Sequence, residues 1–260
     1  MKLIIDIGNT NILLAVFEDT KGYPSAKIMQ RLYTHVFRTD DEYVVVIKSM
    51  FEHTEVDIEK IDYCLISSVV PKLTAVIARA IHKLLEKKPT VLSPALYNRL
   101  PVAIPQSAVH EIGTDILANA VSAYSRYKSA CIAVDFGTAL TFVAVDEDAK
   151  IQGVAIAPGM MTAVNSLFTN TAQLPSVPLE VPESAMGKNT VTAIQSGIVL
   201  GYAGLVDSVL GNMKKEMGVD CPCIATGGLS EVLGKRGDLF TEVDIGLTVT
   251  GLAIIAESLQ

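Results

Sequence analysis

The chain has 260 residues, half of them apolar, and a formal net charge of −7. This length is enough to bury the core of one large or two medium α/β domains. The acidic balance, with no basic patch that carries aromatic residues, lacks the electrostatic footprint of a protein that binds nucleic acid or an anionic membrane, so we expect small molecules as partners.

Nothing in the sequence predicts a secreted or membrane protein. The apolar run at the start is too short for a signal peptide, and polar residues follow it at once. No stretch reaches the roughly 18 uncharged apolar residues of a membrane span, although residues 199–209 are locally very apolar. The four cysteines form no CxxC pair, so we expect buried thiols in the reducing cytoplasm, without a zinc site or a disulfide framework.

The first half of the chain opens with a three-stranded meander. Alternating and β-branched runs predict strands at 2–7, 12–17 and about 30–37. The carboxylates of Asp40, Asp41 and Glu42 suit a helix N-terminus, and Pro71 suits the start of a second helix. The remainder is predicted to contain strands at 63–70 and 90–92, an irregular connector at 100–110 and a helix at 116–127.

The second half repeats the opening meander, which indicates an internal duplication. Its predicted elements are strands at 130–136, 140–145 and 151–157, a helix at 161–168, an extended loop at 174–183, a long helix from 190 to about 217, a strand at 223–225, a helix at Ser230, a strand at 240–243 and a final helix. The long helix is more apolar than one buried face requires, which favours a subunit interface.

The two meanders contain the same kind of turn, Asp-Ile-Gly-Asn-Thr at 6–10 and Asp-Phe-Gly-Thr-Ala at 135–139. A carboxylate at a strand end followed by glycine can form a phosphate loop, because glycine lets backbone N–H groups approach an anion. Asp6 could also hold Mg²⁺, directly or through water. A single turn of this kind is usually an ordinary hairpin, but two at equivalent positions of a repeat indicate a phosphate clamp.

A third element, Thr226-Gly227-Gly228, would let a base or ribose lie against bare backbone. The P-loop and Rossmann glycine motifs are absent, so those nucleotide folds lose their main support. In this order the three elements resemble the two phosphate elements and the adenosine element of the actin-like, sugar-kinase and heat-shock ATPase superfamily. We therefore predict an α/β protein with a duplicated actin-like ATPase (ribonuclease H-like) fold: two mixed five-stranded sheets flanked by helices, in domains 1–114 and 115–260.

Phosphoryl transfer to an alcohol requires a carboxylate that can accept the proton of the hydroxyl. Asp115 is the candidate, because it lies at a glycine-led helix start where the helix dipole keeps a carboxylate ionised. The alternative is an aspartate that only caps the helix.

From end to end, the chain resembles the type III pantothenate kinases, which catalyse the ATP-dependent first step of coenzyme A synthesis. The matching motifs are 6–11, 67–71, 113–115 with 118–120, 135–139, 158–159, 174–175, 187–190, 195–197, 226–228 and 247–248.

The resemblance implies phosphorylation of pantothenate to 4'-phosphopantothenate by a homodimer whose site lies at the interface. It implies Asp115 as the catalytic base, Mg²⁺ bound with ATP and near Asp6, and a monovalent cation, K⁺ or NH₄⁺, near Asp135. The ATP-binding residues that it implies are Asp6, Ile7, Gly8, Asn9, Thr10, Asn11, Ile12, Thr138, Gly227 and Gly228. The substrate-binding residues that it implies are Gly113, Thr114, Asp115, Ile116 and Thr190.

Two departures from the family pattern affect the acceptor side. Ile116 stands where the family usually has arginine, which removes a bidentate partner for a carboxylate or phosphate. The connector 100–112 lacks the tyrosine that the family usually places there. Two other interpretations therefore stay open: a kinase for another small alcohol, and a non-catalytic accessory or regulatory member of the family.

Overall fold

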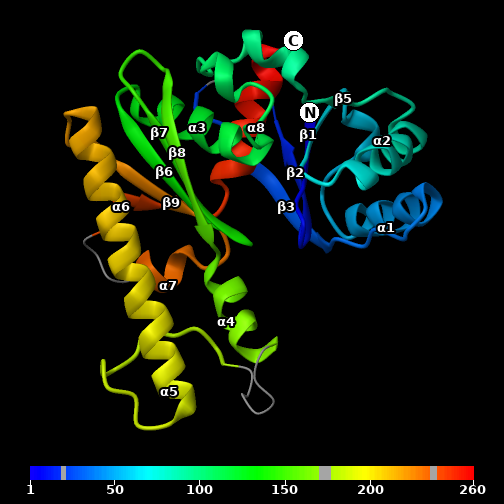
Figure 1. Ribbon diagram of the computed structural model, residues 1–260. Coiled ribbons are helices and arrows are strands. Elements are labelled where there is room, and N and C mark those ends of the chain that lie inside the picture. Colours follow the sequence, from blue (N-terminus) through cyan, green and yellow to red (C-terminus); the bar gives the residue numbers. More distant parts are fainter. Residues whose placement is uncertain (19–21, 170–176, 235–238) are drawn as a thin grey trace. The chain divides into compact units, whose positions relative to one another are not determined.

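The structure is a computed structural model that describes residues 1–18, 22–169, 177–234 and 239–260. The chain forms two compact units, one made of residues 1–126 with 246–260 and the other of residues 127–245. Each unit contains one five-stranded sheet (Figure 1). The units thus divide at 126/127 and 245/246, whereas the sequence suggested a single boundary at 114/115.

The first sheet has the strand order β3-β2-β1-β4-β5. Strands β1, β2 and β3 are antiparallel neighbours, and β4 and β5 run parallel to β1. This mixed five-stranded sheet is the architecture that the superfamily resemblance predicted. Its strands are β1 (Lys2–Ile7), β2 (Asn11–Phe17), β3 (Ala26–Tyr33), β4 (Tyr63–Ser68) and β5 (Thr90–Val91).

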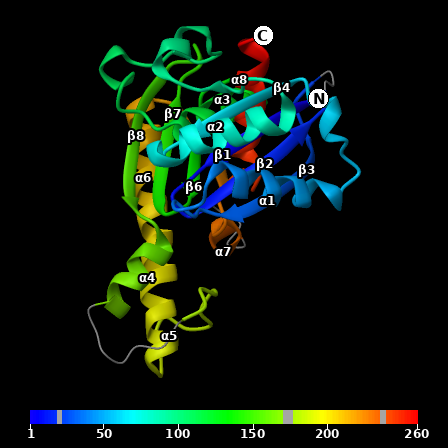
Figure 2. The ribbon, with the colours of Figure 1, turned by 90° about the vertical axis from the view of Figure 1, so that its right-hand side faces the viewer.

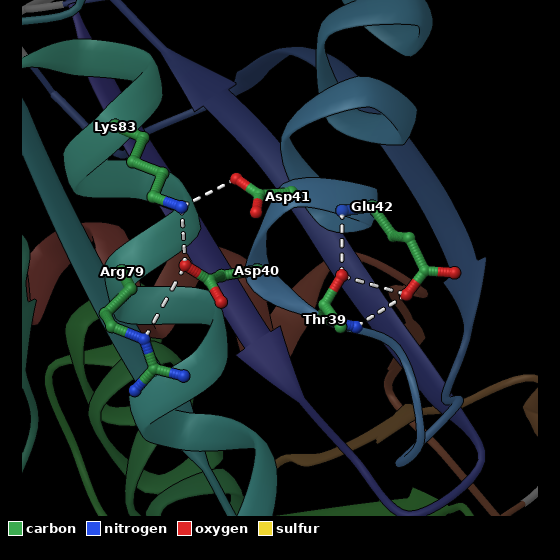
Figure 3. A network of polar contacts seen from close by, with 6 residues as sticks. All are labelled: Thr39, Asp40, Asp41, Glu42, Arg79 and Lys83. Atoms are coloured by element: carbon green, nitrogen blue, oxygen red, sulfur yellow. Dashed lines mark hydrogen bonds and ion pairs between the residues drawn. The ribbon is translucent and has the colours of Figure 1, made fainter.

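Two helices, α1 (Asp40–Glu52) and α2 (Pro71–Leu85), cover one face of this sheet and bury its main core (Figure 2). Thr39 and Glu42 form a capping box at the start of α1. Lys83 of α2 bonds Asp40 at 2.8 Å and Asp41 at 2.6 Å, which ties the two helices together (Figure 3). The carboxylates that predicted the start of α1 therefore also hold α2 beside it.

Helices α3 (Thr114–Tyr127) and α8 (Leu247–Ser258) explain why the C-terminal residues join the first unit. A Cβ at Gly251 would overlap the carbonyl of Ala118, so the two backbones pass in direct contact. Thr248 also donates a hydrogen bond of 2.8 Å to Asn119. The 118–120 and 247–248 motifs therefore serve helix packing. Short 3₁₀ turns at Ile58–Lys60, Pro94–Arg99 and Gln106–Ala108 complete the unit.

The second sheet has the order β10-β9-β6-β7-β8 and the same pairing directions as the first. This correspondence supports the internal duplication. Its strands are β6 (Cys131–Phe136), β7 (Ala139–Val145), β8 (Ile151–Pro158), β9 (Cys223–Thr226) and β10 (Glu242–Val243). Its helices are α4 (Met160–Thr169), α5 (Thr190–Gln195), α6 (Gly201–Met217) and α7 (Ser230–Gly234).

A π-helical turn, Ser196–Leu200, joins α5 and α6 into one helical segment from Thr190 to Met217. By length and composition this is the one helix of the described residues that could cross a membrane. However, Val199, Val206 and Leu210 are buried in the core of the second unit. These residues pack one side of the segment on its own sheet, while only 33% of its most apolar window is buried.

Two predicted elements have different bounds. The strand predicted at 30–37 is β3, which starts at Ala26 and ends at Tyr33, because the next residue turns to bond the β1–β2 loop. The strand predicted at 240–243 is reduced to Glu242–Val243. Of the loop predicted at 174–183, residues 174–176 lie outside the described residues, as does the 174–175 motif.

All four cysteines are free and buried, as predicted. Burial raises the pKa of the Cys131 thiol to about 12 and that of Cys223 to about 11, so both stay protonated at neutral pH.

Candidate active site

The first candidate phosphate loop is residues 8–10, between β1 and β2. The N–H of Gly8 closes it onto the carbonyl of Asn11 at 2.9 Å. Thr34, directly after β3, holds the loop from the other side: its N–H donates to the carbonyl of Thr10 at 2.9 Å and its hydroxyl to that of Gly8 at 2.7 Å. Because a trans peptide is planar, the N–H of Asn9 points away from Thr34, on an exposed loop where an anion can approach. Sequence reasoning missed Thr34.

Asp6 is the penultimate residue of β1, half-buried and beside this loop. Ser67 lies opposite it in the parallel register of β4, and the Ser67 hydroxyl donates to Asp6 Oδ1 at 2.8 Å. The same hydroxyl is 2.9 Å from the hydroxyl of Thr114, the first residue of α3. The structure thereby brings the predicted nucleotide loop and the predicted substrate segment together within the first unit. Ser67 is the first residue of the 67–71 motif, but the sequence alone assigned it no role.

Asp115 lies in the first turn of α3 and is half-buried. Gly113 accepts the first helical hydrogen bond, from the N–H of Leu117 at 3.1 Å, so Gly113 and not Asp115 occupies the cap position. Asp115 Oδ1 accepts from the N–H of Ile116 at 2.9 Å and lies where a Cβ at Gly113 would be. The carboxylate therefore folds back over Gly113, which explains why a glycine leads the motif.

Tyr97 lies on the 3₁₀ turn Pro94–Arg99, where its hydroxyl is affected by the charge of Asp115. Burial, and secondarily the negative charge of Asp115, raise the pKa of the Tyr97 hydroxyl. Ile116 is only 7 % exposed, so an apolar side chain fits its surroundings. An arginine there would have to bring a guanidinium into a covered position.

The second candidate phosphate loop is Gly137-Thr138, between β6 and β7 in the second unit. The N–H of Gly137 bonds the carbonyl of Ala139 at 3.1 Å. The carbonyl of Thr138 accepts from the N–H of Gly159 at 3.0 Å and from the hydroxyl of Thr162 at 2.7 Å. The side chain of Thr138 itself is exposed. This hairpin has the same kind of backbone support as the first.

Asp135 is the penultimate residue of β6, in register with Thr226 of β9. The next residue, Gly227, has a φ of +91°, and a Cβ there would come within 2.5 Å of Asp135 Oδ1 and 2.7 Å of the Phe136 backbone. A Cβ at Gly228 would meet nothing within 4 Å. Only the first glycine of the pair is therefore required by geometry.

Thr190 begins α5, exposed, after Asn189 has capped the helix through a 2.9 Å bond to the N–H of Thr192. The residue lines a hollow of about 620 Å³ in the second unit. The other residues at its rim include Leu167, Gly187, Lys188 and Ala193. Thr190 is thus open to a small molecule.

Comparison with known proteins decides the family. The family model of the type III pantothenate kinases matches residues 2–212. The chain belongs to this family. It is 44% identical over 254 residues to the type III pantothenate kinase of Treponema pallidum (strain Nichols), covering 98% of this chain and 93% of that protein. It is 38% identical to that of Koribacter versatilis (strain Ellin345), covering 100% of this chain and 96% of the relative.

Solved structures establish the actin-like ATPase fold of this type III pantothenate kinase family member. A Campylobacter jejuni protein described as a Baf family transcriptional activator matches with a TM-score of 0.60 at 16% identity, over 99% of this chain and 98% of that one. Component A of (R)-2-hydroxyglutaryl-CoA dehydratase from Acidaminococcus fermentans matches with a TM-score of 0.51 at 13% identity, over 99% and 96%. At these identities the matches show fold alone, and they confirm the predicted fold class.

The donor set of this family member suits cations that arrive with phosphate. Among the described residues, no three His, Cys, Asp or Glu side chains are grouped to hold a metal ion. Mg²⁺ commonly takes one or two carboxylates together with substrate phosphates and water. Asp6 and Asp135, each at a strand end beside a phosphate loop, fit that requirement.

Proposed function

We propose that this protein phosphorylates pantothenate with ATP to give 4'-phosphopantothenate. Membership of the type III pantothenate kinase family supports the reaction. The structural observation that carries it is the hydrogen-bonded series Asp6, Ser67 and Thr114, which links the first phosphate loop to the segment of Asp115. Within the first unit, a proposed nucleotide residue is thus linked by hydrogen bonds to the start of the proposed acceptor segment.

The residues proposed to bind ATP are 6–12 in the first unit and, in the second unit, Thr138 for phosphate and Gly227 and Gly228 for adenosine. The backbone N–H of Asn9 is one group that suits a phosphate oxygen. Mg²⁺, held beside Asp6 when ATP binds, would neutralise charge on the phosphates, and a monovalent cation, K⁺ or NH₄⁺, beside Asp135 would add positive charge that the chain does not supply from a P-loop lysine.

Asp115 would accept the proton of the pantothenate hydroxyl as its oxygen bonds the γ-phosphorus and ADP departs. Gly113, Thr114 and Ile116 would line the acceptor site around this carboxylate, with Thr190 as a further contact. Asp115 is half-buried, so a substrate could still reach its carboxylate. Its Oδ1 accepts a hydrogen bond from the N–H of Ile116, which orients the group.

We also propose that the protein is a cytoplasmic homodimer. The second unit leaves large apolar side chains uncovered on strand β8, with Ile156 67% and Val154 39% exposed. Such residues suit an obligate subunit contact better than open solvent. Analytical ultracentrifugation would test the assembly, and a monomer at micromolar concentration would contradict it.

The reaction is tested by ADP production with Mg²⁺, K⁺ and millimolar ATP, with and without pantothenate. Asp115→Asn should reduce pantothenate-dependent turnover at least about 100-fold, the usual contribution of a general base. Asp57→Asn is the matched control: it removes a charge at another helix start, where asparagine still caps the turn, and it should leave turnover unchanged.

Three results would contradict the proposal. ADP production that ignores pantothenate but responds to another small alcohol would identify a different acceptor. Absence of ATP turnover in a folded protein would favour the accessory role. Equal turnover when Na⁺ replaces K⁺ and NH₄⁺ would contradict a site that requires K⁺ or NH₄⁺.

A further inference from the structure

Ser67 is completely buried, yet neither the fold nor the proposed chemistry assigns it a task. Its hydroxyl lies between two oxygens, 2.8 Å from Asp6 Oδ1 and 2.9 Å from Thr114 Oγ1. Thr114 is itself buried, at 8 % exposure. The three side chains therefore form a short series that is shielded from water at its centre.

The number of protons available decides which group donates in each of these two hydrogen bonds. Ser67 has one hydroxyl proton, and an ionised Asp6 can only accept. The Ser67 hydroxyl then donates its one hydrogen bond to Asp6 Oδ1, and in the second hydrogen bond Ser67 accepts from the hydroxyl of Thr114. A hydrogen bond to a charged acceptor is about twice as strong as one between neutral groups, so the Asp6 contact dominates the orientation of Ser67.

The bond also restricts Asp6. With Oδ1 held by a buried donor on the neighbouring strand, the carboxylate plane is fixed and Oδ2 has a defined direction. The same hydroxyl bonds the first residue of α3, one residue before Asp115. Any rotation of Ser67 would disturb the carboxylate on one side and the helix start on the other.

We propose that Ser67 is a positioning residue that orients the Asp6 carboxylate for Mg²⁺ and couples it to the start of α3. The expected effect on turnover rests on the proposed kinase function. The expected effect on nucleotide binding can be measured separately. Ser67 touches no reacting atom: it acts through Asp6 and Thr114.

The second unit shows that the strand register alone does not create this arrangement. Thr226 occupies the corresponding position beside Asp135, and its hydroxyl is buried without a hydrogen-bond partner in the described structure. The Asp6–Ser67 bond is thus a property of the first site.

The test is calorimetric titration of the full chain with ADP, in the presence and absence of Mg²⁺. In Ser67→Ala the gain in ADP affinity that Mg²⁺ provides should fall about tenfold, the effect of losing a hydrogen bond to a charged group. Ser67→Cys keeps most of the volume with a weak donor and should show a smaller loss, so it serves if the alanine variant does not fold.

Ser68→Ala is the matched control. Ser68 is the adjacent residue, and its hydroxyl bonds the N–H of Val70 at 3.1 Å and the hydroxyl of Thr74 at 2.8 Å, without contact to Asp6 or Thr114. Its Mg²⁺-dependent gain should equal that of the wild type. An equal loss in this control, or an unchanged gain in folded Ser67→Ala, would overturn the proposal.

A double-mutant cycle of Ser67→Ala and Thr114→Val tests the coupling. If the hydroxyls act as one series, the losses in kcat/KM for ATP should not add, and the double variant should resemble the worse single variant. Additive losses would overturn the coupling. If the wild type shows the Mg²⁺-dependent gain but no pantothenate turnover, the proposed function fails while the calorimetric result still decides the role of Ser67.

Discussion

The two candidate phosphate hairpins share a pattern of backbone hydrogen bonds but differ in length, with loop residues 8–10 in the first and 137–138 in the second. In both, the loop glycine closes onto the next strand, Gly8 at 2.9 Å and Gly137 at 3.1 Å. In both, the residue after the third strand donates its N–H to the loop threonine carbonyl, Thr34 in the first unit and Gly159 in the second. The extra hydroxyl comes from Thr34 itself in one case and from Thr162 of α4 in the other.

The reason for this difference lies in how soon a helix follows. In the second unit α4 starts at Met160, so Gly159 lies directly against the loop and has no room for a side chain. In the first unit residues 35–39 separate Thr34 from α1, which leaves room for a threonine. The comparison teaches that the duplication retained a backbone hydrogen bond, while the side chains changed around it.

Gly159→Ala should have the largest effect. A Cβ at this position would overlap the carbonyl oxygens of Gly137 and Thr138, which are backbone atoms with little freedom to move. Overpacking of this kind costs about 3 kcal/mol of unfolding free energy, and we expect the denaturation midpoint and ATP affinity to fall together. Gly153→Ala, on the preceding strand β8 with nothing within 4 Å of its Cβ, is the control and should unfold as the wild type does.

Thr34→Val should have an intermediate effect. Valine keeps the shape and the backbone N–H but removes the bond to the carbonyl of Gly8, which should cost about 1 kcal/mol and weaken ADP binding. Thr162→Val should cost less, since Thr162 is exposed and the carbonyl of Thr138 retains the N–H of Gly159. Urea unfolding of both variants would rank them, and a larger loss in Thr162→Val would reverse our comparison of the two loops.

Thr226→Val should lose no unfolding free energy in the ligand-free protein. The Thr226 hydroxyl is buried without a partner, so replacing it with a methyl group removes an unmet polar atom at nearly constant volume. Ser67→Ala at the corresponding strand position should destabilise, because two hydrogen bonds disappear. Differential scanning calorimetry of Thr226→Val and Ser67→Ala would show whether the two strand positions contribute differently to stability. A clear loss of stability in Thr226→Val would mean that its hydroxyl has a role in stability.

Low pH should have the smallest effect on stability. It should act through two carboxylates that lie outside both loops. The hydrogen bond from Lys83 lowers the pKa of Asp40, and the N–H of Thr39 lowers that of Glu42. Groups with a lowered folded-state pKa contribute stability above the unfolded value of about 4, and that contribution is lost as pH falls through the folded value. Thermal melts from pH 6 to pH 3 should show a gradual decline, which Lys83→Met should reduce. A variant that declines as steeply as the wild type would exclude this ion pair.

Local patterns were enough to predict much of the fold. The runs of β-branched residues marked most strands, because a strand half-buried in a sheet selects for them directly. The two Asp-x-Gly turns and the Gly227-Gly228 pair were visible because glycine tolerates close backbone approach and positive φ. The N-terminal carboxylates of α1 were also read correctly, since the helix dipole and capping act within one turn.

By itself, then, the sequence determined the elements, their duplication, the phosphate-loop candidates and the family resemblance, because these depend on interactions between near neighbours in the chain. The tertiary structure alone decided that α8 joins the first unit through Gly251, that Thr34 and Gly159 hold corresponding carbonyls, and that Ser67 connects Asp6 to Thr114. The partners of these contacts are distant in sequence and meet only through strand register and helix packing, which no local pattern encodes.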